Sequence, residues 1–183
     1  MKRHNKIAPF IRGFCKDISN ETPILVPIRP VDGKPLNECV NIVPEYILAH
    51  GGKERLGWCI HIWKRVLIEA EFHCIWEDPS GKLIDLTPKA EKGGQIIFLP
   101  DPNKKYEGRQ VNNIRKALTP DPLINRYIAM WDEYFRYRNE GDLAYQHGRI
   151  DIKDPEYYNL VHQMEEAQGV LKIKYSNQRN LTA

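Results

Sequence analysis

Two stretches rich in β-branched and aromatic residues adjoin each other in the middle of the chain, and they limit the possible folds more than any other feature. Residues 57–63 read Gly-Trp-Cys-Ile-His-Ile-Trp, and residues 66–76 read Val-Leu-Ile-Glu-Ala-Glu-Phe-His-Cys-Ile-Trp. Such compositions are typical of strands. Only Lys64-Arg65 separates them, so the pattern predicts an antiparallel hairpin with these two residues as its turn.

The next turn indicates how a third strand pairs with this hairpin. Asp78-Pro79-Ser80-Gly81 has Pro at the second turn position and Gly at the left-handed one, as in a three-residue hairpin loop. That loop pairs Ile75 with Asp85 in a strand over residues 82–87. Together with a fourth strand expected over residues 95–99, this predicts a small antiparallel sheet.

Helical patterns lie on both sides of the predicted sheet. Apolar positions in residues 37–50 follow helical spacing, and Pro44 either kinks this helix or marks its true beginning. Two amphipathic helices are expected near residues 122–139 and 155–169, and each follows an Asp-Pro pair that fits an N-cap and a first helical residue. The chain is therefore expected to be α+β.

These patterns divide the chain into three parts. Residues 1–36 contain five prolines and one apolar run, Ile24-Leu25-Val26, which predicts an extended N-terminal arm with one edge strand. Residues 37–101 form the predicted core, in which a helix packs on the sheet. Residues 102–183 form a predicted helical C-terminal lobe.

Composition excludes some classes of protein. With 183 residues, of which 42% are hydrophobic, the chain can bury a core. The net charge of +3 is spread along the sequence, which makes nucleic acid an unexpected partner, and no apolar run is long enough to cross a membrane. The start of the chain has no apolar signal core, so we expect a cytoplasmic protein.

Three residue types that work together in thiol chemistry occur in the predicted core. Cys39 is expected at a helix start, where the helix dipole and a neighbouring imidazolium favour a thiolate. In the three-residue-loop register, His73 and Asp85 are diagonal neighbours on one face of the hairpin. A four-residue loop would instead put them on opposite faces. The acidic neighbour Glu38 opposes a thiolate unless its side chain points away.

The order of these residues resembles the papain-like superfamily, which includes transglutaminase-like members. This resemblance implies that Cys39 attacks a carbonyl carbon, that His73 acts as general base and then acid, and that Asp85 orients His73. The implied activity is a thiol hydrolase that acts on an amide, peptide or isopeptide bond of a peptide or protein substrate, without a cofactor. The implied fold is a papain-like core with the helical lobe appended.

The resemblance also suggests supporting residues. Asn37, just before the cysteine, is the candidate oxyanion donor beside the backbone amide of Cys39, and Trp58 and Glu71 are candidate substrate contacts. The stretch Ile68-Glu69-Ala70-Glu71-Phe72-His73, with Asp85-Leu86-Thr87-Pro88, is similar to a group of bacterial and phage proteins without a known activity. That closer similarity implies no substrate.

Two other interpretations stay open. Cys59, His61 and Cys74 share a strand face if Lys64-Arg65 is a two-residue turn, and with Cys39 they could bind a metal, although buried core thiols are the more common role of such cysteines. We therefore assign no metal site.

The second alternative is a catalytically inactive protein-binding module on the same fold. The aromatic and basic residues of the C-terminal lobe would then bind the partner, although the helical stripe formed by Trp131, Tyr134, Phe135 and Arg138 is more often a packed face. The loop over residues 104–109 could contact phosphate or a substrate, and it is more commonly a solvated loop.

Overall fold

The computed structural model describes residues 7–36, 38–89, 94–146 and 150–176. In this part of the chain the fold is α+β, as predicted, with four α-helices and a six-stranded sheet. The chain divides into two compact units. Unit 1 comprises residues 1–61 and 70–107, and unit 2 comprises residues 62–69 and 108–183. Residues 62–69, from the middle of the chain, thus belong to the same unit as the C-terminal part.

The strands follow the order β1-β5-β2-β3-β4, and β6 pairs with β3 beside this path. The pairs β1/β5, β2/β5 and β3/β4 are antiparallel, so the predicted antiparallel sheet is confirmed. The strands are β1 (Ile24–Pro27), β2 (Lys53–Trp63), β3 (Leu67–Glu77), β4 (Leu83–Ile84), β5 (Gln95–Pro100) and β6 (Ile114–Ala117). The helices are α1 (Pro9–Lys16), α2 (Cys39–His50), α3 (Pro122–Arg138), η1 (a 3-10 helix, Gly141–Tyr145) and α4 (Pro155–Ser176).

The β3–β4 hairpin has the predicted register. Trp76 pairs with Ile84, and the same register places Ile75 opposite Asp85. The Asp78 side chain stabilises the turn, because its Oδ1 accepts hydrogen bonds from the backbone N–H of Ser80 at 2.8 Å and of Lys82 at 2.9 Å. The three-residue loop is therefore confirmed.

The third strand is shorter than predicted, because Asp85 leaves the β3 ladder. Its N–H donates to the carbonyl of Pro27 at 2.9 Å, and its carbonyl accepts from the N–H of Arg29 at 2.8 Å. These bonds form an isolated parallel bridge to the segment that follows β1. The backbone of Asp85 is thus held by the N-terminal part of the chain.

The β2–β3 connection differs from the predicted two-residue turn. The strands end at Trp63 and begin again at Leu67, so three residues connect them, and Arg65 adopts a left-handed conformation with φ of 66°. One extra residue in a connection moves side chains to the opposite face of the sheet. Accordingly, Cys59 and Cys74 lie in different hydrophobic clusters, and the metal set predicted from a two-residue turn is not formed.

Helix α2 begins at Cys39 and continues through Pro44 to His50. The alternative that the helix starts near Pro44 is therefore wrong. Pro44 is the sixth helical residue, so it lacks the N–H that would bond the carbonyl of Val40. Burial of one helix face against the sheet compensates for this loss, since Ile42 and Val43 pack on Trp76 and Leu86.

The N-terminal arm contains a helix that the sequence analysis did not predict. Its prolines indicated an extended segment, but Pro9 occupies the start of α1, where proline is compatible with a helix. Ile11, Phe14 and Cys15 form the buried face of this helix. The predicted edge strand is confirmed as β1, which pairs with β5.

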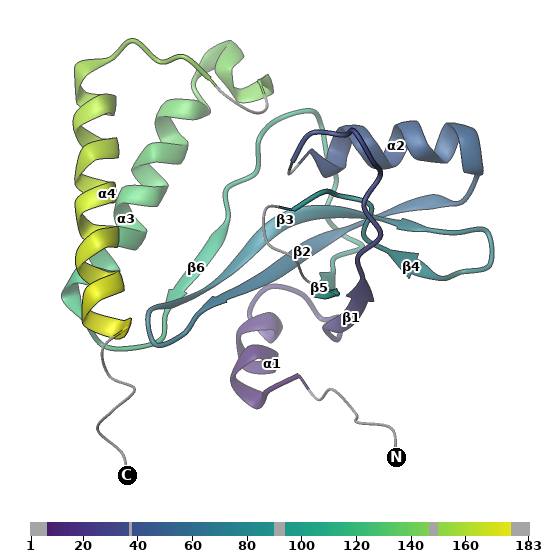
Figure 1. The fold of residues 1–183 in the computed structure, drawn as a ribbon, viewed down its shortest axis with the longest axis horizontal. Coiled ribbons are helices and arrows are strands. Elements are labelled where there is room, and N and C mark those ends of the chain that lie inside the picture. Colours follow the sequence, from purple (N-terminus) through teal and green to yellow (C-terminus); the bar gives the residue numbers. More distant parts are fainter. Residues whose placement is uncertain (1–6, 37, 90–93, 147–149, 177–183) are drawn as a thin grey trace. The chain divides into compact units, whose positions relative to one another are not determined.

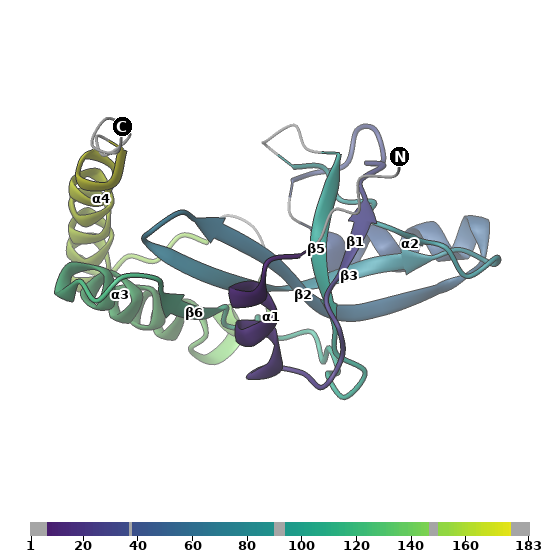
Figure 2. The same cartoon turned by 90° about the horizontal axis from the view of Figure 1, so that it is seen from below.

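Unit 1 has hydrophobic clusters on both faces of its sheet. One cluster joins α2 to the side chains of Cys74, Trp76 and Leu86, and the other surrounds Phe98 and includes Cys59. Helices α1 and α2 lie on opposite sides of the strands (Figures 1 and 2). Apolar residues therefore occupy both faces of the strands, as the adjacent Cys74 and Ile75 of β3 do in the two clusters.

In unit 2, α3 and α4 pack side by side (Figure 1). The predicted Asp caps are confirmed: Asp121 accepts from the N–H of Leu123 at 3.0 Å, and Asp154 accepts from the N–H of Glu156 at 2.7 Å. Trp131 and Tyr134 are partly buried against the hydrophobic clusters between the helices. These two rings of the aromatic stripe thus contribute to helix packing.

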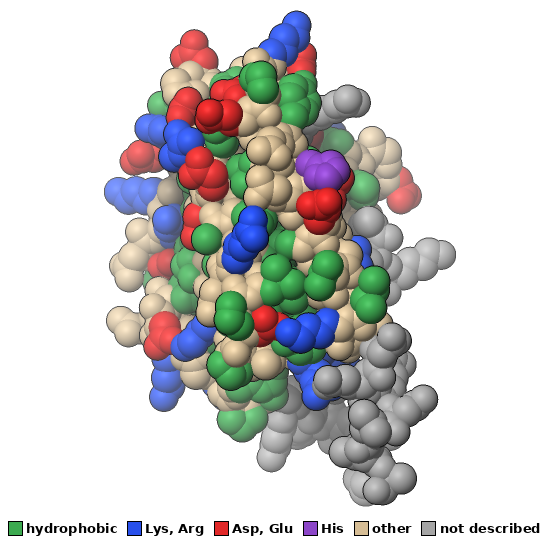
Figure 3. Space-filling model, turned by 90° about the vertical axis from the view of Figure 1, so that its left-hand side faces the viewer, with side chains coloured by type: hydrophobic (Ala, Val, Ile, Leu, Met, Phe, Trp, Pro, Cys, Tyr) green, Lys and Arg blue, Asp and Glu red, His purple; other side chains and the backbone are tan. Residues whose placement is uncertain are grey.

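Charged side chains of both signs are interspersed with hydrophobic ones on the face that Figure 3 displays. Salt bridges such as Arg136 to Glu133 at 2.7 Å and to Glu140 at 2.8 Å link part of the surface of unit 2. None of the helices within the described residues combines the length and the apolar character that crossing a membrane requires.

Gly57 is a position where the fold of unit 1 can be tested. A Cβ atom added there would overlap the carbonyl of Leu99 and lie 2.7 Å from Cζ of Phe98. We expect Gly57→Ala to lower the free energy of unfolding by about 1–3 kcal/mol, as overpacking of a core does. Urea denaturation measures this change. Gly94→Ala is the matched control, because nothing lies within 4 Å of its added Cβ; an equal effect of both substitutions would contradict the close packing of β2 on β5.

Candidate active site

Cys39 is the first residue of α2, and its side chain is buried between the helix and β3. Its exposed fraction is 5%. The Sγ atom accepts a hydrogen bond from the backbone N–H of Cys74 at 3.4 Å. The first turn of α2 contains no acidic residue, so the positive end of the helix dipole acts on the sulfur without an opposing charge in that turn.

His73 and Asp85 are in direct contact inside unit 1. The distance from His73 Nε2 to Asp85 Oδ1 is 3.1 Å, and their exposed fractions are 3% and 0%. This contact follows from the β3–β4 register, which places the two side chains on one face of the hairpin. Because Nε2 faces the carboxylate, Nδ1 is the ring nitrogen left for the Cys39 sulfur.

The environment of His73 favours its protonated form. Burial alone would lower the pKa of the imidazole, but hydrogen bonds to Asp85 and to the Cys39 sulfur, together with their negative charges, raise the pKa of His73 to about 10. The ring is thus in direct contact with the carboxylate, and the sulfur is near enough to raise the pKa of the ring. The structure brings together the three residues predicted from the sequence, Cys39, His73 and Asp85.

Asp85 is held as a carboxylate by several partners. Its Oδ1 also accepts from the N–H of Thr87 at 3.0 Å, and Lys89 Nζ lies 3.6 Å from Oδ2. Burial raises the pKa of Asp85, but the hydrogen bond from His73 and the charges of His73 and Lys89 outweigh it and keep the pKa below its usual value. The carboxylate is thus a fixed acceptor for the imidazole.

Glu38 and Asn37 precede Cys39, and the structure describes only Glu38. Glu38 is the N-cap residue of α2, and its Oε2 accepts a hydrogen bond from the side-chain amide of Asn41 at 3.2 Å on the exposed side of the helix. Its carboxylate therefore has a partner other than the sulfur. Asn37, the predicted oxyanion donor, lies outside the described residues.

Tyr106 is a neighbour of the site that the sequence analysis missed. Burial, and to a smaller extent the charge of the nearby Cys39 sulfur, raise the pKa of Tyr106. Its ring stacks on Phe72, with 5.9 Å between ring centroids. The only sequence signal was a polar loop over residues 104–109, and nothing in it predicted that Tyr106 stacks on Phe72.

The two predicted substrate contacts have partners within the protein. Trp58 is buried, and its Nε1–H donates to Asp101 Oδ2 at 3.1 Å. Its ring also meets Phe72 edge to face. Glu71 pairs with His61, with 2.8 Å between Oε2 and Nε2. Their role toward a substrate stays a prediction.

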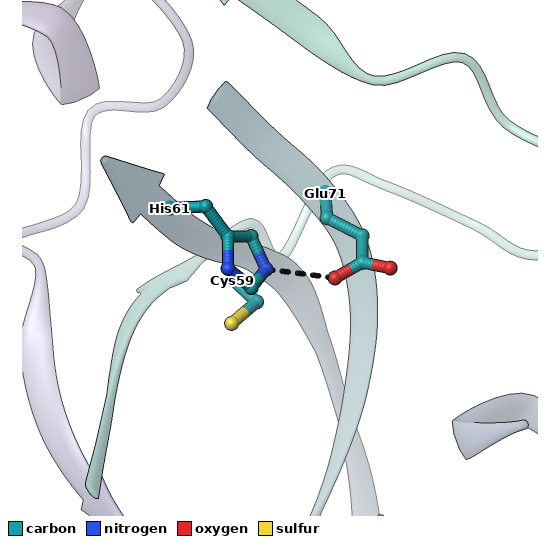
Figure 4. Close-up of side chains that lie close together, drawn as sticks. All are labelled: Cys59, His61 and Glu71. Carbon is teal, nitrogen blue, oxygen red and sulfur yellow. Dashed lines mark hydrogen bonds and ion pairs between the residues drawn. The ribbon is translucent and has the colours of Figure 1, made fainter. Parts of the chain in front are cut away.

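A second group of a cysteine, a histidine and an acid lies on β2 and β3. One donor atom each from Cys59, His61 and Glu71 lies within 4.8 Å of the other two (Figure 4). Hydrogen bonds to Cys59 and Glu71 raise the pKa of His61 to about 10. Cys59 and His61 are also the metal ligands that the sequence suggested, but the third ligand expected with them, Cys74, faces α2.

Unit 1 also contains a pocket of about 600 Å³. Its lining includes four carboxylates and two basic residues, which are Glu21, Glu54, Glu77, Asp101, Arg55 and Lys104. Cys39, His73 and Asp85 do not line it. The pocket is thus a separate feature from the buried triad.

Comparison of the chain with protein-family models, with curated proteins and with solved structures found no match. Any statement about function therefore rests on the residues and their geometry.

The protonation of His73 gives a direct test of the site geometry. With a pKa near 10, the ring is expected to be protonated at pH 8 and to lose its proton only as the pH rises through about 10. In Asp85→Asn the carboxylate that favours the charged ring is absent, so the transition should move to lower pH. NMR of the ring nitrogens measures it, with Asp132→Asn in α3 as the control that should leave it unchanged.

Removal of Asp85 also tests the contribution of the pair to stability. Asp85→Ala leaves a buried imidazole without its carboxylate, and we expect the free energy of unfolding at pH 7 to fall by about 3–5 kcal/mol. Replacing both partners by apolar residues, as in His73→Phe with Asp85→Ala, should recover part of this loss. Urea denaturation of the single and double variants measures the coupling, and purely additive effects would contradict the contact.

Proposed function

We propose that the chain is a thiol hydrolase that cleaves an amide, peptide or isopeptide bond through an acyl-enzyme on Cys39. The observation that supports this most strongly is the buried imidazole of His73, whose Nε2 lies 3.1 Å from Asp85 Oδ1 and whose pKa is raised both by that carboxylate and by the nearby Cys39 sulfur. A nucleophile, a base and a group that orients the base are the parts that covalent acyl transfer requires. The order of helix, strand and strand also supports a papain-like arrangement of the core.

Each residue has a defined role in the proposed reaction. The Cys39 thiolate attacks the carbonyl carbon, and the imidazolium of His73 then donates its proton to the leaving amine. A water molecule, deprotonated by neutral His73, attacks the thioester and releases the acid. Asp85 keeps the ring oriented and stabilises its positive charge throughout.

The tetrahedral intermediate needs donors for its oxyanion. The backbone N–H of Cys39 is one candidate, because it belongs to the first turn of α2, where amides lack helical acceptors. Asn37 remains the candidate that the sequence suggests.

Burial of the triad favours the alternative, a catalytically inactive binding module on the same fold. The three side chains are at most 5% exposed, so a substrate can reach the sulfur only if the neighbouring chain moves. A buried, hydrogen-bonded network can also serve stability alone. Reactivity of the sulfur separates these two functions.

Alkylation of the native protein tests whether Cys39 is activated. All four cysteines are free and buried, so differences in their reaction with limiting iodoacetamide report activation more than exposure. Burial raises the pKa of Cys15 to about 11 and also raises that of Cys74. We expect Cys39 to react at pH 6 at least about tenfold faster than Cys15 and Cys74, as measured by mass spectrometry of the modified peptides.

Variants assign this reactivity to the triad. His73→Ala should reduce the rate at Cys39 to that of Cys15 and Cys74, whereas His162→Ala on the surface of α4 should not change it. Unchanged reactivity in His73→Ala would contradict the proposed activation. Acetylation of Cys39 by p-nitrophenyl acetate, followed by turnover, would then distinguish a hydrolase from a module whose thiol reacts once and stays modified.

A further inference from the structure

We propose that Cys59, His61 and Glu71 form a binding site for one zinc ion, separate from the triad of Cys39, His73 and Asp85. The three residues come from two neighbouring strands, with Cys59 and His61 on β2 and Glu71 on β3 (Figure 4). They supply one sulfur, one nitrogen and one oxygen donor, all within 4.8 Å of one another.

The donor types determine the class of metal. Thiolate and imidazole ligands suit zinc, whereas magnesium and calcium prefer sites built from oxygen atoms alone. Three protein ligands leave a fourth tetrahedral position for water or another small ligand. A sulfur, nitrogen and oxygen set therefore fits zinc with an open coordination position.

The spacing of the donors is close to what zinc requires. Bond lengths of about 2.0–2.3 Å to the three donor types place tetrahedral ligand atoms roughly 3.4–3.6 Å apart. Reducing a separation of at most 4.8 Å to this range requires movements of about 1 Å. His61 Nε2 and Glu71 Oε2 are already 2.8 Å apart, so these two need to separate slightly while both turn toward the sulfur.

Burial differs among the three residues in a way that suits such a site. Cys59 is 1% exposed and packs in the cluster around Phe98, so its sulfur is a fixed donor at the base of the site. The side chains of His61 and Glu71 are 45% and 33% exposed. They can change rotamer at little cost, and their exposure gives both the ion and a fourth ligand access from solvent.

Metal titration of the full chain tests this proposal. The metal-free protein is titrated with Zn²⁺ in competition with a chromophoric chelator, and with Co²⁺ to follow the thiolate-to-cobalt charge-transfer band. We expect one ion per chain and a cobalt band that reports sulfur ligation. His61→Gln and Glu71→Gln each remove one exposed ligand and should weaken zinc binding by at least about 100-fold, more than the loss of an outer-shell partner does.

The controls separate this site from the triad and from folding defects. Cys59→Ser should abolish the cobalt band, and Cys39→Ser should retain both the band and the zinc affinity. The two exposed glutamine variants keep the test valid if Cys59→Ser fails to fold. His162→Gln, which removes a surface histidine near Glu166, should have no effect.

Three results would overturn the proposal. They are an absent cobalt band in wild-type protein, zinc binding that persists in both glutamine variants, and loss of binding in Cys39→Ser, which would place the ion at the triad. The first two results leave the thiol hydrolase proposal unchanged, because alkylation of Cys39 is measured in metal-free protein. The third would count against both proposals.

Discussion

The buried contact between His73 and Asp85 is the interaction on which the candidate site depends. An ionised pair in a protein interior is stable only when its partners satisfy it, because burial of a lone charge costs several kcal/mol. Here the carboxylate also accepts from Thr87 and lies near Lys89. The segment after β1 bonds the backbone of Asp85 on both its N–H and its carbonyl. The N-terminal part of the chain therefore helps to position the acid.

Local sequence signals predicted the His73–Asp85 contact because a short turn determines it. Pro79 and Gly81 limit the loop to three residues, and a strand period of two then places both side chains on one face. The two-residue turn predicted at Lys64-Arg65 was wrong, because three residues connect β2 and β3. Nothing in the sequence indicates the third residue of that connection or the left-handed conformation of Arg65. As a result, Cys59 and Cys74 lie on opposite faces of the sheet and not on one face as predicted.

Features that arise from long-range packing could not be predicted from the sequence, because local patterns do not report contacts between distant segments. Pro44 indicated a disturbed helix, but packing of α2 on β3 and β4 keeps the helix continuous from Cys39. Helix α1 has a short apolar face formed by Ile11, Phe14 and Cys15, and prolines nearby obscured it. The ring of Tyr106 stacks on Phe72, which is far away in the sequence, and no periodic pattern reports such a contact.

The β2–β3 hairpin contributes to both units, since its tip over residues 62–69 belongs with unit 2 and the rest with unit 1. Neither unit is therefore a continuous piece of chain. A fragment that begins at Gly108 would contain β6 without β3, the strand with which it pairs, and so would leave an unpaired edge. The C-terminal helices, although last in sequence, therefore pack on residues from a hairpin in the middle of the chain. We expect the two units to fold together and not as separate fragments.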